Sequence, residues 1–586
     1  MASDFVLGKN FLAPIQYHSM DVYGLGEGFQ NLYSSPIDEI NSNPAAKFDL
    51  HSKHFFQLDL GGQELFDDES SVPGGVYPMY EYSSMIMPTW SQYRQAEEKE
   101  DYEPAFRIFY LGHPLKSLDN LRLGMAFDWI YEISEFYQPY DYWGIRYLDA
   151  MGADYENSGD EPYDDYNLRQ AGDDENINQG YHLSFFAAHP LTSSINIGMR
   201  YTLTDEQVDG SLWDMRSDDQ SDYYDEAISF NDSETERKQE FISNDLMIGL
   251  DLSLGDGANL GFSAGMLAGD LDRDFNQTDS SMYHYVQYDP YPDLSLDDSL
   301  FYSSTYTHRS TKNWDYDGQT LYGGIQYRSS ETNGIHYRFS VYGEQRKADL
   351  SESENMLQNN DYSNRYFSYY DTTRSEYTSI SWATVERNGT GNFEHLLFRG
   401  TGGIDWNVSP TFRFLGGLQL QMSDRQLTSK EPFAGEKYAF TERDGNYYYS
   451  GTDERSQIDE KEFAWNRSEQ EFTVRLPVGF IFKFGEFFQL QSGLTKVFRK
   501  TDVSENYDVI VERYYHTRNN NGVVTTVDDS DYVDGFKFPD INTFDNTFEF
   551  NGGLSFVFAD NFAASLVFSN AFADNYSIKL GGQLKW

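Results

Sequence analysis

The segment Tyr576-Ser577-Ile578-Lys579-Leu580-Gly581-Gly582-Gln583-Leu584-Lys585-Trp586 ends the chain in strict two-residue alternation. One set of alternate positions carries Tyr576, Ile578, Leu580, Gly582, Leu584 and Trp586, and the other carries Ser577, Lys579, Gly581, Gln583 and Lys585. Successive side chains of a β-strand point to opposite faces of the sheet. The pattern therefore predicts a terminal strand with one apolar and one polar face.

The same alternation recurs upstream, in residues 246–254, 412–422, 472–483 and 547–558. These segments run to roughly 10–13 residues, which is the length that a tilted strand needs to cross a bilayer. Strands of soluble sheets are usually shorter, at about 5–6 residues. We therefore predict an all-β fold, a transmembrane antiparallel β-barrel. The polar faces carry charge, as a lumen does, and the side chains expected to face it include Arg413, Arg475, Lys483, Glu549 and Lys579.

The composition combines acidity with aromaticity. The formal net charge is -52 and 24% of residues are charged, yet 17% are aromatic, with 46 Tyr and 44 Phe. The two facts agree if charge lies in loops and aromatic rings lie in strands and interfacial girdles. No stretch approaches 18 consecutive apolar residues, which excludes a transmembrane helix. The charge disfavours nucleic-acid binding. A soluble acidic all-β protein is the alternative, and it predicts purification without detergent.

Long polar stretches alternate with short connections along the chain. The stretches lie near 136–180, 204–240, 268–316, 347–393, 425–469 and 501–542, and we interpret them as long acidic extracellular loops. Every second connection is short, which is typical of periplasmic turns. This spacing predicts one barrel over residues 51–586, with about 14 strands and 16 as the alternative.

The acidic loops have two interpretations. One is a solvated, self-repelling surface. The other is divalent-cation binding, because carboxylate oxygens at high density suit Ca²⁺. The sharpest local candidate is Asp270-Leu271-Asp272-Arg273-Asp274, in which Asp270, Asp272 and Asp274 have the spacing of an EF-hand loop. Phe275 and Ser281 replace the Gly and the Glu that an EF-hand needs, so only a less regular calcium loop would fit.

The amino-terminal segment carries two short motifs. The first runs from Tyr23 to Leu32 and contains Gly24, Gly26, Gly28 and Phe29, and the second is Asn43-Pro44-Ala45-Ala46. In this order, ahead of a barrel, they resemble the hatch of the long-chain fatty acid transporter (FadL-like) family and its PorV/PorQ-like relatives. The resemblance covers about 25 residues, with Gly28 and Ala46 departing from the usual residues. It implies a hatch over residues 1–50 that plugs a barrel of about 14 strands.

The two branches of that family imply different functions. The fatty-acid branch implies a hatch-plugged channel for the uptake of small, hydrophobic solutes. The PorV-like branch implies a non-transporting barrel that docks a secretion complex, and a surface-lattice or adhesion protein is a related alternative. The acidic loops depart from fatty-acid transporters, since an anionic mouth repels carboxylates.

The carboxyl terminus also indicates a location. Lys579, Gly581, Leu584 and Trp586 have a spacing that resembles the signal recognised by the assembly machinery of bacterial outer-membrane barrels. We therefore expect a cell outer membrane location, with lipid and that machinery as partners. Residues 1–5 lack the basic and apolar regions of a signal peptide, so we expect the mature chain.

The residues suggest no catalytic chemistry. The 11 His are scattered, and neither a G-x-S-x-G nor a P-loop pattern occurs. The chain has no Cys, which removes thiolate metal sites and disulfides. We therefore expect a protein that is not an enzyme and has no cofactor, with Ca²⁺ in the loops as the one candidate ion.

Overall fold

The computed structural model describes residues 12–33, 35–46, 54–61, 105–113, 121–134, 165–221, 225–255, 257–288, 299–368, 373–445, 450–529, 536–537, 540–559, 562–569 and 577–585. Almost all of them belong to one antiparallel sheet. Three short helices precede it: α1 (Met20–Leu25), η1 (Glu27–Phe29) and α2 (Pro36–Ser42). No helix among the described residues is long and apolar enough to cross a membrane.

The strands fall into two groups by length. Six are short, with 7 to 19 residues: β1 (His54–Gly61), β2 (Phe106–Gly112), β3 (Arg122–Ser134), β16 (Ile541–Ala559), β17 (Phe562–Ser569) and β18 (Ser577–Lys585). Ten are long, with 26 to 37 residues: β4 (Asp165–Pro190), β5 (Ile195–Ser221), β6 (Asp225–Ser253), β7 (Asn259–Tyr288), β8 (Ser299–Arg328), β9 (Ile335–Ser368), β10 (Thr373–Ser409), β11 (Phe412–Gly445), β12 (Gly451–Phe484) and β13 (Phe488–Asn520). Two more, β14 (Val523–Asp529) and β15 (Phe536–Lys537), pair only with β13.

The sheet closes on itself. The carboxyl-terminal β18 pairs with β1, and β13 pairs with β16, so that sixteen strands form an antiparallel ring. The alternative of 16 strands is confirmed, and the count of about 14 is wrong. That correction extends to the strand number implied by the family resemblance. The early strands β1 to β3 lie beside long undescribed segments, and the sequence left their number open.

Short turns gather at one end of the barrel. They join β4 to β5, β6 to β7, β8 to β9, β10 to β11 and β12 to β13. The carboxyl end of β18 lies at the same end, because Leu584 pairs with Phe562, the first residue of β17. The predicted alternation of short and long connections therefore holds on this side, which we call the short-turn end.

The side-chain distribution is inverted relative to a soluble protein. Near the short-turn end, the outward positions carry large apolar side chains that are well exposed, such as Ile248 at 59%, Val341 at 61% and Val478 at 50%. The inward positions carry buried polar side chains, and Arg200, Asp128 and Gln491 are each 0% exposed. We call the exposed apolar surface the outer apolar band. It includes Phe185, Met199, Ile248, Met266, Leu321, Val341, Phe398, Leu420, Val478, Leu494, Phe548 and Leu580.

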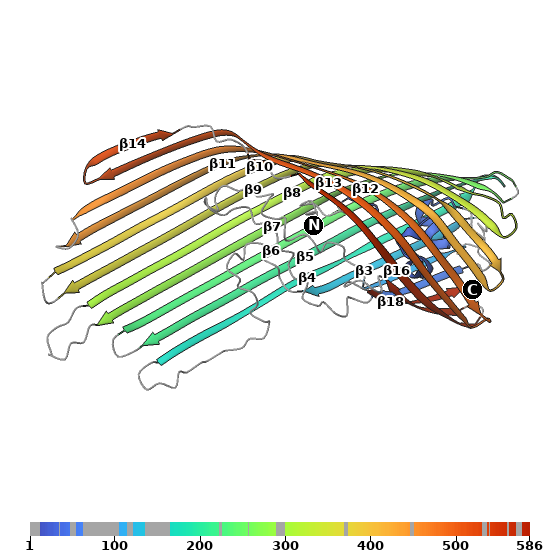
Figure 1. Ribbon diagram of the computed structural model, residues 1–586, viewed down its shortest axis with the longest axis horizontal. Coiled ribbons are helices and arrows are strands. Elements are labelled where there is room, and N and C mark those ends of the chain that lie inside the picture. The colour runs from blue at the N-terminus through green and yellow to red at the C-terminus, as the bar shows by residue number, and fades with distance from the viewer. Residues whose placement is uncertain are drawn as a thin grey trace.

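The predicted long loops are wrong in their secondary structure. In all six ranges the described residues are mainly strand, because β4 to β13 continue far past the outer apolar band. Figure 1 shows these strands running on as a tall curved wall, while the short strands stay near the helices. Beyond the band the outer face carries polar and charged side chains, so the outward apolar stripe of the lipid-facing segments is missing there and the sequence looks like loop. Residues 136–164 of the first range lie outside the described part.

Candidate functional site

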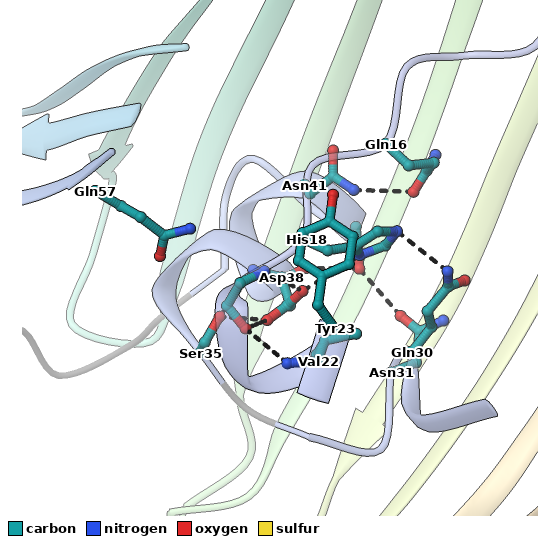
Figure 2. Close-up of polar contacts among 12 residues, drawn as sticks. Gln16, His18, Val22, Tyr23, Gln30, Asn31, Ser35, Asp38, Asn41 and Gln57 are labelled. Atoms are coloured by element: carbon teal, nitrogen blue, oxygen red, sulfur yellow. Dashed lines mark hydrogen bonds and ion pairs between the residues drawn. The ribbon is translucent and has the colours of Figure 1, made fainter. Parts of the chain in front are cut away.

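The amino-terminal segment, residues 12–46, lies within the closed end of the barrel (Figure 1). Serine caps begin both of its α-helices: the Ser19 hydroxyl accepts from the Val22 amide, and the Ser35 hydroxyl accepts from the Asp38 amide. Such caps satisfy amide groups that a helix start leaves free. The Ser19 hydroxyl also donates to Asp38 at 2.6 Å, and the Ser35 hydroxyl donates to the same carboxylate. Asp38 thus joins the starts of α1 and α2 (Figure 2).

Apolar side chains of the segment pack on two parts of the inner wall. Tyr17, Ile37 and Ile40 pack with a group from β1 to β4 that comprises Phe55, Phe109, Leu111, Ala126 and Phe186. On the other side, Val22, Leu25, Phe29 and Tyr33 pack with Leu415 of β11 and Ile481 of β12. The segment is therefore held from both sides of the lumen.

Glycines allow the closest approaches between segment and wall. A Cβ at Gly24 would lie 2.1 Å from the Gln491 amide nitrogen, and one at Gly28 would lie 2.8 Å from the Thr495 hydroxyl. Gly26 has a φ of +99°, a conformation that favours glycine. From the wall side, a Cβ at Gly198 would lie 2.4 Å from the Pro44 carbonyl. Glycine at these positions therefore lets the segment pack directly against the wall.

Arg200 of β5 is the central polar contact between wall and segment. Its Nη1 donates to the Asn41 side-chain oxygen at 2.8 Å and to the Asn41 carbonyl at 3.3 Å. Its Nη2 donates to Asp245 of β6 at 2.8 Å, and the Tyr322 hydroxyl donates to the other oxygen of Asp245 at 2.5 Å. One guanidinium therefore links three strands to α2 in a buried environment.

A second buried group lies on β2 to β5. Arg107 donates two hydrogen bonds to Asp128, at 2.7 and 2.8 Å, and a third to the Tyr23 hydroxyl at 2.8 Å. The His182 ring lies between Asp128, at 3.3 Å, and Glu206, at 2.6 Å. The group neutralises charge within the wall and contacts α1 through Tyr23.

A third contact involves Glu39 of α2. Its carboxylate pairs with Arg338 of β9 at 2.8 Å and lies 3.6 Å from Arg328 of β8. Next to it, a cavity of about 40 Å³ lies between α2 and β6 to β9. A volume of that size has room for about three waters. The boundary between segment and wall therefore combines ion pairs with a small polar space.

Beyond the segment, an apolar belt crosses the inner wall. The inner apolar belt comprises Phe241, Leu271, Phe275, Trp314, Tyr316, Leu350, Phe393, Leu427 and Trp465, from β6 to β12. Leu12, the first described residue, packs in the same cluster, and its carbonyl accepts from Thr320 at 2.7 Å. Trp465 is 0% exposed and its indole nitrogen donates to Glu505 at 2.9 Å. An apolar belt is unusual for a water-filled lumen.

The predicted lumen residues face inward. Arg413 pairs with Asp405, with 2.6 Å between Nε and Oδ1, and lies over the Tyr33 ring at 4.7 Å. Arg475 donates to Gln419 at 3.3 Å. Glu549 is the register partner of the buried Thr495. Lys483 is exposed and lies beside the short turn.

The carboxyl-terminal residues also contact the segment. The Lys579 ammonium lies 3.9 Å from the centre of the Tyr23 ring, and a Cβ at Gly581 would lie 2.6 Å from Met20. Leu584 is 38% exposed on the outer face. Trp586 lies outside the described residues.

The predicted calcium residues are placed differently from expectation. Asp270, Asp272 and Asp274 lie in β7 and not in a loop, and all three are exposed on its outer face. Alternate residues of a strand are about 6.8 Å apart, which is too far for the three carboxylates to surround one ion. Within the described residues, no group of three or more His, Cys, Asp or Glu side chains is placed to hold a metal.

Sequence reasoning missed the main wall contacts. Arg200, Asp128 and His182 are not among the residues that the sequence pattern singles out. An available signal was the alternation of Ile197, Met199 and Tyr201 with polar residues, which places Arg200 on the inner face. The partner of an inward charge depends on strand register, and one sequence does not give that register.

Comparisons with known proteins give only distant likenesses. No protein-family model and no curated protein matches the chain. Among solved structures, the ferric enterobactin receptor in complex with BCV-L6 is 8% identical, with a TM-score of 0.25, covering 94% of this chain and 87% of that one. The siderophore receptor PirA from Pseudomonas aeruginosa is 8% identical, with a TM-score of 0.16 and coverages of 72% and 80%. The unliganded ferric citrate transporter FecA is 8% identical, with a TM-score of 0.17 and coverages of 72% and 78%. Scores this low say nothing of this chain's ligand.

Proposed function

We propose that the chain is an outer-membrane β-barrel channel whose amino-terminal segment closes the lumen. The observation that supports it is the combination of two surfaces. The outer apolar band suits lipid, and the polar inner wall holds a buried segment. A barrel is the one sheet architecture that spans lipid with every backbone group paired. A ring of sixteen strands is wide enough to leave an aqueous channel when it is not filled.

The closing role rests on the kind of contact that holds the segment. Arg200 and Arg107 each bind a wall carboxylate and a residue of the segment, and Arg338 of the wall pairs with Glu39 of the segment. Buried ion pairs add little net stability but fix one arrangement. The cavity next to Glu39 has room for waters that would replace such contacts during opening.

For the solute, we propose a small molecule with an apolar part. The inner apolar belt lies directly beyond the segment and offers aromatic and aliphatic side chains at the level where a solute would meet the closed lumen. An entirely polar solute would gain nothing from Leu427 or Trp465. The belt is buried in this structure, so the solute would bind as the segment moves.

The chain has no native cysteine, so a pair of introduced cysteines can form a single disulfide that locks the segment to the wall. A Cβ at Gly28 would lie 3.1 Å from the Cβ of Pro477, which is about 0.4 Å below the Cβ–Cβ range of disulfides, so the backbone must shift by roughly that much for the bond to form. The variant Gly28→Cys with Pro477→Cys joins segment to wall. The control, Gly391→Cys with Ser429→Cys, joins register partners on β10 and β11 whose Cβ positions would lie 3.2 Å apart. Each pair is compared when oxidised and when reduced.

The readout is accumulation of an apolar fluorescent dye by cells that carry the chain in an outer membrane. The parent, the control pair and the reduced lock should raise accumulation above cells without the chain. Oxidation of the lock alone should abolish the rise. If the parent does not raise dye accumulation, the transport role is wrong. If dye accumulation still rises with the oxidised lock, the dye passes by a route that bypasses the segment.

A second candidate is a docking, lattice or adhesion barrel without transport. The tall wall favours it, since β4 to β13 extend far beyond the outer apolar band and present protein surface away from lipid. A parent that leaves dye accumulation unchanged would promote this candidate.

A further inference from the structure

Four tyrosines form a continuous row across the tall wall. The ring centroids of Tyr283 and Tyr302 are 5.3 Å apart, those of Tyr302 and Tyr362 are 4.9 Å apart, and those of Tyr362 and Tyr377 are 5.3 Å apart. The interplanar angles are 75°, 89° and 81°. We call this row the tyrosine ladder. It spans β7 to β10, and Arg443 of β11 extends it, with its guanidinium carbon 5.6 Å from the Tyr377 ring centre.

The ladder lies on the inner face. The pairing of β7 with β8, β8 with β9 and β9 with β10 is continuous over the whole length between the inner apolar belt and the ladder. Faces therefore keep their parity along each strand. Tyr302 shares its face with the buried Trp314, and Tyr362 shares its face with the buried Leu350. The neighbouring Phe301 lies on the opposite, outer face and is 40% exposed.

The ladder is accessible, unlike the inner apolar belt. Tyr283 is 37% exposed, and the other three rings are partly exposed. Side chains on the same face are amides and hydroxyls: Asn364 lies 3.4 Å from the Tyr362 hydroxyl, and the Ser379 hydroxyl lies 3.4 Å from that of Thr441. The continuous row of rings is thus flanked on its own face by hydrogen-bonding groups.

A cavity adjoins the ladder on the same wall. It has a volume of about 460 Å³, and inward residues that line it include Gln358, Ser381, Ala383, Lys437 and Gln457. Volumes of this order hold small ligands. Tyr377, Ser379 and Ser381 are successive inward positions on β10. The cavity and the ladder therefore form one continuous surface.

Charge on this surface changes along the row. At the β7 end, Asp279 accepts from Ser233 and Gln277. At the other end, Lys437 and Arg443 join Arg455 and Arg518, which both bind Asp453. The cationic end lies on the inner face of a chain whose net charge is -52. An anionic ligand would be repelled by most of the outer surface and attracted here.

We propose that the tyrosine ladder and the adjoining cavity bind an acidic oligosaccharide, with its carboxylates toward Lys437 and Arg443. Sugar rings have apolar C–H faces that pack on aromatic rings and hydroxyls that bond to amides. A ladder with one ring per strand is about 15 Å long and matches a chain molecule better than a compact one. This inference concerns the wall beyond the membrane and does not depend on transport.

The test is calorimetric titration of the full chain in detergent with hexagalacturonate and with the neutral maltohexaose. Hexagalacturonate should bind, and maltohexaose should bind at least about tenfold more weakly. Replacing two rings, Tyr302→Ala with Tyr362→Ala, should weaken hexagalacturonate about tenfold. Tyr362→Phe keeps the ring and should stay within about twofold, since its stacking is retained. Lys437→Gln should reduce the preference for the acidic sugar.

Phe301→Ala is the matched control, because it removes an aromatic ring from the same strand on the other face. It should bind as the parent does, and heat-modifiable gel mobility verifies that every variant is folded. Failure of both sugars to bind, equal binding of the neutral sugar, or equal weakening by Phe301→Ala would each overturn the proposal.

Discussion

Arg200 and Asp245 form an ion pair with 2.8 Å between Nη2 and Oδ2, and their side chains are 0% and 2% exposed. The pair joins neighbouring strands of the wall, yet the same guanidinium also binds Asn41 of the amino-terminal segment. The stability of the wall and the closure of the lumen therefore both depend on the Arg200 side chain.

The variant Asp245→Asn should destabilise the barrel by about 3 kcal/mol, because it leaves a buried guanidinium without its counter-charge. The matched control is Glu376→Gln, whose partner Arg365 is 64% exposed. That change should cost less than about 1 kcal/mol. Denaturant unfolding in lipid vesicles measures both, and equal losses would contradict the role assigned to Arg200.

A charge in the outer apolar band should be costly. Val478→Arg should destabilise the membrane-inserted barrel by about 2–4 kcal/mol if the residue lies near the bilayer midplane. Ile458→Arg is the control on the same strand and face, at 39% exposure but beyond the band. It should cost about 0–1 kcal/mol, since water surrounds it. Similar costs at both positions would mean that the band does not contact lipid.

The Asp453 carboxylate should make the end of the tall wall sensitive to acid. Hydrogen bonds from Arg518 and Arg455 lower its pKa from 3.8 to about 2. A lowered pKa contributes stability that is fully present above about pH 4 and is lost as pH falls toward 2. The melting temperature of the parent should therefore fall toward that of Asp453→Asn over this range. If the difference in melting temperature between the parent and Asp453→Asn stays constant over this pH range, Asp453 does not titrate within it.

Carboxylates on the outer face of the wall should repel one another. Asp317 of β8 is the register partner of both Asp270 and Asp349, and all three are exposed. Directly opposed like charges are unfavourable, so Asp317→Asn should raise stability by roughly 0.2–1 kcal/mol. Added Ca²⁺ should raise the melting temperature of the parent more than that of the variant. Equal shifts would show that calcium does not act at this row.

Several features of the fold were predictable from sequence because lipid imposes a strong pattern. Where one face of a strand meets lipid and the other meets a polar lumen, apolar and polar residues alternate. Leu418 beside Gln419 and Val478 beside Gly479 are examples. The barrel class, the inward residues such as Arg475 and the short turns all follow from that contrast. The strand number did not follow, since closure depends on which strands pair and not on any one strand.

The tall wall was not predictable for the opposite reason. Around Asp272, the outer face of β7 lies beyond the outer apolar band and carries carboxylates, and acidic residues there resemble a solvated loop. The glycines of the first motif, such as Gly24 and Gly28, are visible in the sequence, and glycine tolerates close approach of segment and wall. The pairing of Arg200 with Asn41 is not visible there, because a contact between residues far apart in sequence needs the register of three strands.

Single-channel recording in planar lipid bilayers tests the central claim most directly. The parent and a variant that lacks residues 12–46 are compared after both show the gel mobility of folded barrels. The account predicts that the parent is closed for most of the recording and that the deletion variant conducts steadily, as an unfilled barrel of this size should. Equal conductance in the two proteins would contradict the proposal that the amino-terminal segment closes the lumen.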